Sequence, residues 1–341
     1  MAQYTINDIA RISGYSRGTV SRVLNNDKNV KPTTRDRIVQ VIEQLNYHPN
    51  AMARGLVSGK LDIVALIMGD VRNPFFASIA YYVQSMMQEL GYMVVLFNSN
   101  FDAETEEENI RIAQKMNFRG IFLISSRMDA VSCEEIKNST CPIVLLHRII
   151  KGFAGDFVVQ DNFHAGYAVA NHLIELGHNR IAFLQGQSNS NSSASRVEGF
   201  RSAMSNAMLP VEEEYIYKGD FSFDRGYEIG CEYVGNLDGK PKAIICGNDM
   251  MALGFIEACK AGHISVPEDV SVASFDDIDI AQMESIQLTT VHQPVQEMCQ
   301  KACEIMAARI TGASLPTSRI MLNPTLIVRK TTCHYRDNSS Q

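Results

Sequence analysis

The sequence predicts a protein in two parts: a small domain of three helices, followed by a larger α/β body made of two similar halves. Two patterns support this prediction. In the first sixty residues, apolar side chains recur at the three- and four-residue spacing of short helices. From Leu61 onward, short apolar runs alternate with amphipathic stretches, and the series restarts near residue 181. Such alternation is typical of a parallel sheet covered by helices.

Local end signals place the helices of the small domain. Thr5 and Asp8 have capping-box spacing at the start of the first helix, and Gly14 suits the left-handed turn that ends it. Ser16 is a good N-cap for the second helix, and the third starts near Thr33. Three short helices with a tight glycine turn between the first two predict a helix-turn-helix. The alternative is a small helical bundle whose polar face is only solvated.

Charge is distributed unevenly along the chain. Residues 1–60 carry nine Lys and Arg residues against four Asp and Glu residues, a formal charge of +5, whereas the whole chain of 341 residues carries −7. The rest of the chain therefore carries −12. A basic head on an acidic body indicates that only the head meets nucleic-acid phosphates, although a chance fluctuation would look the same.

The body pattern resolves into elements of ordinary length. Strands are expected at 63–68, 93–97, 121–124, 143–146, 181–185, 215–219, 243–246 and 270–275. Helices are expected near 75–90, 103–117, 130–138, 163–176, 194–207, 223–235 and 249–262. Ligands of such sheets bind beyond the carboxyl ends of the strands, so two halves predict a ligand cleft between them. Neither half contains a Walker A or G-x-G-x-x-G motif, so no nucleotide cofactor is expected.

Other features argue against several classes of function. Eight cysteines are scattered without a C-x-x-C pair, so we expect no metal site and a reducing compartment. The amino end has no apolar signal region and no apolar run approaches ~18 residues, so we expect a cytoplasmic protein without a membrane partner. Residues 14–18 match the G-x-S-x-G nucleophile elbow, but that turn follows a strand, and a helix is expected here. We therefore expect no catalytic residues and no enzyme activity.

The amino end resembles the headpiece of the lac repressor (LacI/GalR) family. The matching residues are 5–10 (TINDIA), 13–16 (SGYS), 19–25 (TVSRVLN) and 46–56 (NYHPNAMARGL). The resemblance implies a helix-turn-helix DNA-binding domain over 1–48, whose second helix enters the major groove. The expected DNA contacts within it are Thr5, Ser16, Arg17, Gly18, Thr19, Ser21, Arg22 and Asn25.

One position departs from the family pattern. The two residues after the N-cap serine often read bases in that family, and here they are Arg17 and Gly18. Glycine has no side chain with which to read a base. Either the readout falls on Arg17 and Arg22, or Gly18 lets the backbone approach DNA closely.

The linker at 49–60 is expected to be a hinge helix. Pro49 disfavours continuation of the third helix, and residues 51–57 make about two turns, too short to hold alone in water. The resemblance implies that this segment folds in the minor groove at the operator centre. Its expected contacts are Asn50, Ala53, Arg54 and Leu56, and Leu56 matches the residue that wedges between base pairs. A flexible linker is the alternative.

The body resembles the type I periplasmic sugar-binding fold, which the same family uses to sense effectors. The resemblance implies an effector-binding and dimerisation domain over 61–341, with the chain crossing between two lobes near 161, 291 and 323. The N-lobe is then expected at about 61–161 and 292–322, with a late helix at about 295–311. The C-lobe is expected at about 162–290 and 323–341, with a last strand at 325–328.

Side chains suited to a sugar lie at the predicted strand ends. Aromatic rings stack on sugar C–H faces, and hydroxyl groups need fixed partners because an unmatched buried polar group costs about 1–3 kcal/mol. The position in the fold and the resemblance together predict effector contacts from Asn73, Phe75, Phe76, His147, Arg148, Arg196, Phe221, Asn248, Asp276 and Gln293. In the plainer alternative, the phenylalanines are core and the arginines pair with surface acids. Asp249 fits a helix cap better than a ligand contact.

His147 is a second departure from the family pattern. Sugar binders of this fold often have Asp at this position, and His can donate a hydrogen bond where a carboxylate only accepts. An unusual or acidic sugar is therefore one interpretation of the effector.

The combined prediction is a homodimeric transcription regulator. It would bind a near-palindromic operator, most simply as a repressor of a sugar or sugar-acid utilisation operon, and an effector in the cleft would switch it. The tail after Val328 lacks leucine heptads, so a tetramerising coiled coil is not expected. The competing hypotheses are a solute-binding transport protein and a sugar-processing enzyme. The basic head and the absence of an apolar signal region oppose the transport protein, and no nucleophile–base pair or metal cluster in the sequence supports the enzyme.

Overall fold

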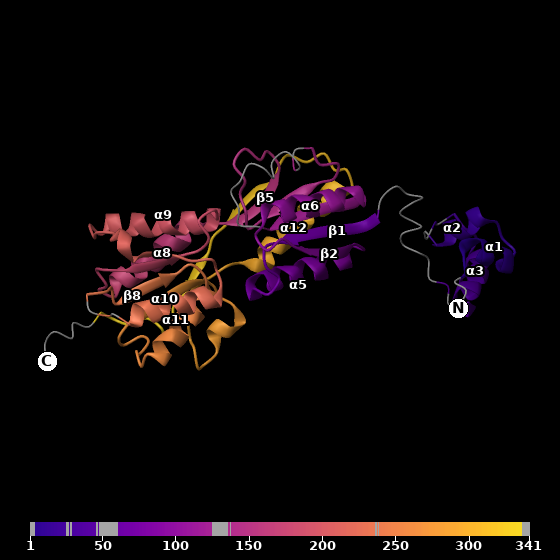
Figure 1. Ribbon diagram of the computed structural model, residues 1–341. Coiled ribbons are helices and arrows are strands. Elements are labelled where there is room, and N and C mark those ends of the chain that lie inside the picture. Colours follow the sequence, from indigo (N-terminus) through magenta and orange to yellow (C-terminus); the bar gives the residue numbers. More distant parts are fainter. Residues whose placement is uncertain are drawn as a thin grey trace. The chain divides into compact units, whose positions relative to one another are not determined.

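The chain divides into two compact units, Met1–Leu61 and Asp62–Gln341. The first is a helical head and the second is an α/β body (Figure 1). The computed structural model describes residues 4–24, 27, 29–45, 47, 61–124, 136, 138–235, 237 and 239–335.

The head contains three helices, as predicted. They are α1 (Ile6–Ser13), α2 (Arg17–Leu24) and α3 (Pro32–Gln44). Both halves of the capping box between Thr5 and Asp8 form, and Gly14 takes φ 77° and donates its N–H to Ala10 at the end of α1. The apolar stripes of the three helices meet in one small core, made of Ile9, Val20, Val23, Ile38 and Val41.

The N-lobe of the body is a six-stranded sheet in the order β11-β5-β4-β3-β1-β2. Its strands are β1 (Leu61–Met68), β2 (Met93–Asn98), β3 (Phe118–Ile124), β4 (Ile143–Leu146), β5 (Asp156–Gln160) and β11 (Arg319–Leu322). Its helices are α5 (Pro74–Glu89), α6 (Ala103–Lys115) and α12 (Val295–Ile310). The helix expected at 130–138 lies almost entirely outside the described residues.

The C-lobe repeats this plan with the order β12-β10-β9-β8-β6-β7. Its strands are β6 (Ala182–Gln185), β7 (Ile216–Lys218), β8 (Ala243–Cys246), β9 (Ser271–Asp276), β10 (Thr289–His292) and β12 (Thr325–Ile327). Its α-helices are α8 (Asn162–Glu175), α9 (Asn191–Asn206), α10 (Phe223–Val234) and α11 (Asp249–Ala261). Strand β12 runs antiparallel to β10, whereas the other paired strands described in both sheets run parallel.

The chain passes between the lobes at three places. It leaves the N-lobe after β5 and enters the C-lobe at α8, returns between β10 and α12, and leaves again between β11 and β12. The predicted fold class, a helix-turn-helix head and a two-lobed α/β body, is confirmed. Strands β5, β10 and β11 were not expected as strands. Each lies next to a crossing, and β5 and β11 pair with each other although they are far apart along the chain.

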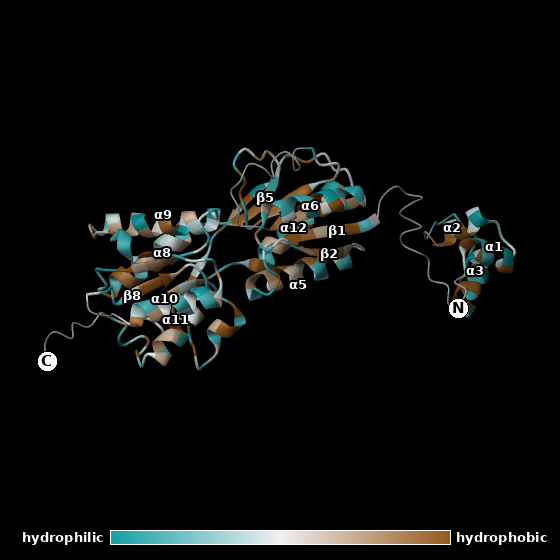
Figure 2. Cartoon of the chain, in the orientation of Figure 1, coloured by the Kyte–Doolittle hydropathy of each residue, from teal (hydrophilic) through white to brown (hydrophobic). Residues whose placement is uncertain are grey.

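Apolar residues concentrate along the strands of the body and polar residues on the outer helix faces (Figure 2). Most inward-facing strand residues have no exposed surface, as expected for a parallel sheet covered on both faces. This burial fixes the carboxyl ends of the strands, where the loops begin.

Candidate functional site

The exposed side of α2 in the head carries the residues predicted to meet DNA. Arg17, Gly18 and Arg22 are exposed, and Thr19 and Ser21 are half-buried. Ser16 caps the helix, because its Oγ accepts the N–H of Thr19 at 3.2 Å. Val20 and Val23 occupy the opposite side of the helix, in the core. The helix is therefore held by its apolar side and presents a short polar stripe to a partner.

Gly18 is not required by packing inside the head. A Cβ built at this position would meet only Ser16 Oγ, at 3.8 Å. The missing side chain therefore leaves room on the exposed face of α2. Thr5 is exposed at the start of α1, where its Oγ1 donates to Asp8 Oδ2 at 2.8 Å. The remaining predicted DNA contacts, Asn25, Asn50, Ala53, Arg54 and Leu56, lie outside the described residues.

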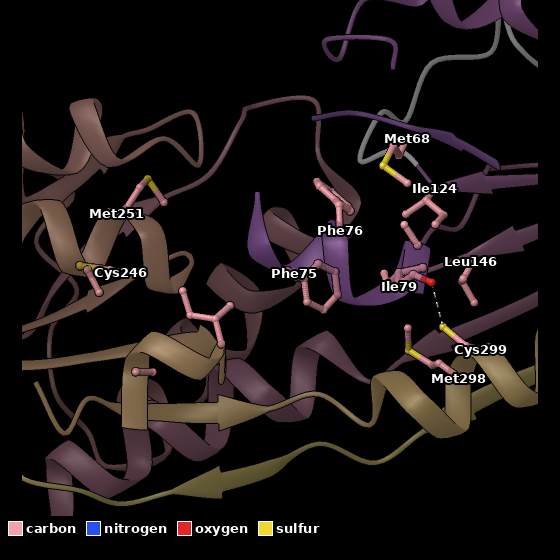
Figure 3. Packing of buried hydrophobic residues seen from close by; sticks show 14 of the residues in the cluster. Met68, Phe75, Phe76, Ile79, Ile124, Leu146, Cys246, Met251, Met298 and Cys299 are labelled. Carbon is pink, nitrogen blue, oxygen red and sulfur yellow. Dashed lines mark hydrogen bonds between the residues drawn. The ribbon is translucent and has the colours of Figure 1, made fainter. Parts of the chain in front are cut away.

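In the body, a cavity lies where the strand ends of the two lobes meet. The free space inside it is about 20 Å³, so its walls lie close together in this structure. Its described lining is Asn73, Phe75, Phe76, Phe101, His147, Ser192, Arg196, Phe221, Asn248 and Asp276. Eight of these were predicted from the sequence, and they come from both lobes. Figure 3 shows Phe75 and Phe76 between the core side chains of the N-lobe and those around Met251.

Four lining residues have left-handed backbone conformations. The φ angles are 58° at Phe101, 57° at His147, 72° at Phe221 and 117° at Asp276. Such values are uncommon for residues other than glycine and concentrate at functional sites. Each turns the chain sharply just after a strand and places a side chain in the cavity wall.

The two lobes place an aromatic ring by the same device. Gly69 follows β1 and lies under the Phe101 ring, and a Cβ built on it would be 2.0 Å from that ring. Gly186 follows β6 and lies under the Phe221 ring in the same way, at 1.9 Å. Only glycine leaves room for these rings. Sequence reasoning found Phe221 but missed Phe101, and comparing the two halves would have found it.

Arg196 is held from three sides in the cavity wall. Its Nε donates to Asn162 Oδ1 at 2.9 Å and its Nη1 to the Gly247 carbonyl at 2.6 Å. The guanidinium lies 4.5 Å from the centre of the Phe275 ring. Its Nη2 is 3.8 Å from Asp276 Oδ1, too far for a hydrogen bond. A buried cation is thus kept in place with one edge turned toward the cavity.

Asp276 faces Arg196 and accepts a hydrogen bond from Gln293, which lies where the chain leaves the C-lobe after β10. Gln293 Nε2 donates to Asp276 Oδ1 at 2.5 Å. Burial raises the pKa of Asp276 to about 8, against the opposite effect of the Arg196 charge. Gln293 itself does not line this cavity. It lines a neighbouring cleft and reaches the site through Asp276.

Asp249 lies behind the cavity and has a structural role. Its carboxylate accepts hydrogen bonds from Ser274, from Thr290 Oγ1 at 2.6 Å and from the Ile278 N–H at 2.9 Å. It therefore ties α11 to β9 and β10. The cap of α11 is Asn248, whose Oδ1 accepts the Met251 N–H, and not Asp249 as we had expected.

His147 lines the cavity from the N-lobe as a neutral ring. Burial, with a smaller contribution from the Arg196 charge, lowers its pKa to about 3. The ring lies 4.8 Å from Phe75, at an angle of 59°. Its Nδ1 is buried and has no hydrogen-bond partner in the described part of the chain. The imidazole therefore offers a hydrogen-bonding position to a ligand.

Arg148 is not among the described lining residues, although the sequence analysis placed it at the site. Its Nη1 donates to Glu106 Oε1 at 2.8 Å, and both side chains are 1% exposed. Glu106 lies on α6, so the partner is a buried carboxylate and not a surface acid. Burying a charge costs much less when an opposite charge is bonded to it, which accounts for the direction that Arg148 takes.

Asn73, Asn248 and Ser192 are fixed at the rim by the ends of helices. Asn73 Oδ1 caps α5 through the Phe75 N–H at 3.0 Å, and Asn248 Nδ2 donates to the Phe221 carbonyl at 3.0 Å. Ser192, in the first turn of α9, bonds Ser190 at 2.9 Å. Sequence reasoning missed Ser192 because its loop is rich in Ser and Asn, and nothing local distinguishes one from another.

Comparison with known proteins shows what this pair of domains is. Residues 5–50 match the model of bacterial regulatory proteins of the lacI family, and residues 170–332 match the periplasmic binding protein-like domain. The ribose operon repressor of Escherichia coli is 32% identical over 328 residues, which cover 95% of this chain and 98% of that protein. The chain belongs to the lacI family.

Solved structures agree with the fold. The transcriptional regulator CelR in complex with cellobiose is 28% identical, with a TM-score of 0.73 and coverage of 96% of this chain and 100% of that one. The lac repressor dimer bound to operator and an anti-inducer is 23% identical, with a TM-score of 0.87 and coverage of 97% and 100%. The chain is thus a DNA-binding transcription regulator with a ligand-binding body, and not an enzyme. No helix in the described ranges is long and apolar enough to cross a bilayer.

Proposed function

We propose that this regulator is a cytoplasmic repressor of a sugar or sugar-acid utilisation operon. It binds a near-palindromic operator as a homodimer, and a sugar or sugar acid in the cavity between the lobes switches its affinity for DNA. The observation that carries the proposal is the cavity itself. Its walls combine aromatic faces with fixed polar groups at the strand ends of both lobes.

The chemistry of the lining suits a polyhydroxylated ring. Phe75, Phe101 and Phe221 offer faces for C–H groups, while Arg196 and Asp276 offer one donor edge and one acceptor. The ribose operon repressor among the relatives, and CelR with bound cellobiose among the structures, support a sugar as the class of effector. His147 supports a sugar acid within that class, because an imidazole can donate to a carboxylate.

A second copy of the chain is the proposed protein partner. Tyr81 on α5 and Met93 on β2 are 69% and 61% exposed. Strand β2 is the edge of the N-lobe sheet, and Leu96 on the same strand is also exposed. A large apolar group on an unpaired edge is better stabilised when another surface covers it. Sedimentation equilibrium of the full chain is expected to give a dimer mass.

Operator binding is proposed for the head and for the linker that follows it. We propose that α2 enters the major groove with Arg17 and Arg22, and that Leu56 wedges into the minor groove at the operator centre. The exposed polar stripe of α2 supports the first part. The second rests on the resemblance of residues 46–56.

The test is a thermal-shift screen with matched pairs of neutral sugars and their acids. Suitable pairs are D-ribose with D-ribonate, D-glucose with D-gluconate, and D-galactose with D-galacturonate. A ligand that binds only the folded state raises its stability by about 2.7 kcal/mol at a hundred times its dissociation constant. A rise in Tm with at least one sugar supports the proposal, and a larger rise with the acid of a pair supports the sugar-acid class. A flat response to a broad panel would reject the effector class.

A further inference from the structure

The first crossing between the lobes carries an amide side chain that bonds a residue of the cavity wall. Strand β5 ends at Gln160 in the N-lobe, and α8 begins at Asn162 in the C-lobe. Asn162 Oδ1 accepts two hydrogen bonds, from Gln160 Nε2 at 2.8 Å and from Arg196 Nε at 2.9 Å. One oxygen thus joins the last residue of an N-lobe strand to a cavity residue of the C-lobe.

The second crossing has a matching link. Gln293 follows β10 and donates from Nε2 to Asp276 Oδ1 at 2.5 Å. That oxygen is 3.8 Å from Arg196 Nη2. A continuous polar chain therefore runs from one crossing to the other through the cavity wall. This hinge chain consists of Gln160, Asn162, Arg196, Asp276 and Gln293.

Both ends of the hinge chain hold an unsatisfied acceptor. Gln160 Oε1 and Gln293 Oε1 are buried and have no hydrogen-bond partner in the described residues. Such groups are rare in folded proteins because they lose their hydration without replacement. A movement of either crossing that supplies a donor is therefore favourable.

The helices that carry the chain cannot slide to absorb a movement of Arg196. A Cβ built on Gly166 of α8 would lie 2.0 Å from the Arg196 carbonyl oxygen. A Cβ on Gly199 of α9 would lie 2.0 Å from the Phe163 carbonyl oxygen. The helices α8 and α9 thus touch backbone to backbone. When the guanidinium of Arg196 turns, its side-chain partners must respond.

We propose that Asn162 and Gln160 are positioning residues that couple the effector cavity to the first crossing between the lobes. The inference rests on the proposed function, since it takes the cavity as the effector site. Asn162 holds Arg196 from the first crossing between the lobes. A change in the position of Arg196 therefore alters the hydrogen bond between Asn162 and Gln160. Binding of an effector in the cavity thereby alters the hydrogen bond at Gln160, the last residue of β5, where the chain crosses between the lobes.

Hydrogen exchange of the full chain, measured by mass spectrometry, tests the coupling without sugar or DNA. Asp276→Asn changes the part of the hinge chain far from Asn162, and the new side chain has about the same size. The readout is the peptide containing the Asp161 N–H, which bonds the Leu322 carbonyl at 3.0 Å and so joins two crossings. We expect Asp276→Asn to raise exchange there about fivefold, which corresponds to a coupling of about 1 kcal/mol between groups in contact. In an Asn162→Ala background, Asp276→Asn is expected to leave exchange unchanged.

Two variants serve as controls. Asn162→Asp keeps an acceptor for both Arg196 and Gln160, so it is expected to retain the response. Asn171→Ala removes an amide from the same helix that donates to Glu175 at 2.7 Å, outside the hinge chain, and this variant should also retain the response. If Asn162→Ala does not fold, Gln160→Met removes the other amide and should abolish the response equally.

The inference is overturned if Asp276→Asn leaves the crossing unchanged in the otherwise native chain. It is also overturned if the response persists in Asn162→Ala or Gln160→Met. Because the readout uses no ligand, a failed sugar screen would reject the proposed function and leave this result standing. A failed exchange experiment would reject the coupling and leave the effector site standing.

Discussion

Each lobe of the body holds a buried arginine close to a strand end, and the two have different roles. Arg148 of the N-lobe is bonded to Glu106, and both side chains are 1% exposed. Arg196 of the C-lobe meets its carboxylate, Asp276, only at 3.8 Å and lines the cavity. Both are buried arginines, one just after β4 and the other within α9, and they differ in the partner that each meets. A bonded carboxylate makes an arginine structural, while one kept at a distance leaves the arginine available to a ligand.

The two lobes are alike in how they place an aromatic ring in the cavity and differ in the pKa shift of their titratable lining group. Each places a phenylalanine over a glycine after a strand, Phe101 over Gly69 and Phe221 over Gly186. Their titratable lining groups, however, have opposite pKa shifts, to about 3 for His147 and to about 8 for Asp276. In both cases burial disfavours the charged form. The two lobes thus place one aromatic ring alike and differ in the titratable group that each contributes.

The largest expected effect is the loss of the structural arginine. Arg148→Ala leaves Glu106 buried without its cation, which should lower the free energy of unfolding of the body by about 3–5 kcal/mol. Urea denaturation followed by circular dichroism measures this change. Arg111→Ala removes half-exposed pairs with Glu107 and Glu108 on one helix and should change this free energy by less than about 1 kcal/mol. A body equally stable with either variant would show that Arg148 is not structural.

Arg196 is expected to matter for binding more than for folding. Arg196→Ala should weaken binding of the most stabilising sugar by about 10- to 100-fold, since hydrogen bonds to charged groups contribute about 1.5–3 kcal/mol. Calorimetric titration gives the dissociation constants. Arg201→Ala, on the same helix and paired with Glu213 at the surface, is the matched control and should bind normally. Equal affinity in both variants would place the ligand elsewhere.

The opposite shifts of His147 and Asp276 predict opposite effects of pH on stability. A neutral His147 in the fold makes the unfolded state bind more protons, so stability is lost as pH falls from about 6.5 toward 3. A protonated Asp276 in the fold binds more protons than the unfolded chain, so its contribution is lost as pH rises from about 4 to 8.

Two substitutions separate these effects in unfolding curves measured across pH. His147→Gln should reduce the loss of unfolding free energy as pH falls below about 6.5. Asp276→Asn should reduce the loss as pH rises from about 4 to 8. Each change in slope is at most about 1.4 kcal/mol per pH unit. If either variant follows the parent curve, the corresponding side chain is not buried in its uncharged form.

The smallest expected effect tests the symmetry of the aromatic pair. Phe101→Leu and Phe221→Leu should each weaken sugar binding by about 0.5–1.5 kcal/mol, the usual value of a ring contact beyond its area. Calorimetric titration with the same sugar compares the two. A strong effect of one variant and none of the other would show that only one lobe stacks on the ligand.

Much of the fold and part of the site could be predicted from the sequence, where the signals are local. The ends of helix α1 were predicted because the capping box of Thr5 and Asp8 and the turn at Gly14 are local signals. Strand β5, in contrast, is short and is stabilised by pairing with β11, more than 150 residues away, which no local pattern reveals. Eight lining residues were predicted because they follow strands. The direction of Arg148 was not, since it depends on Glu106 of another element.

The most direct test of the account is the affinity of the full chain for a labelled duplex from its own upstream region, measured by fluorescence anisotropy. The titration is run with and without the most stabilising sugar, for the native chain and for Arg196→Ala. We expect the sugar to change the native dissociation constant by at least about tenfold, while Arg196→Ala binds the duplex and does not respond. A sugar that raises Tm and leaves DNA affinity unchanged, or an Arg196→Ala chain that switches fully, would contradict the account.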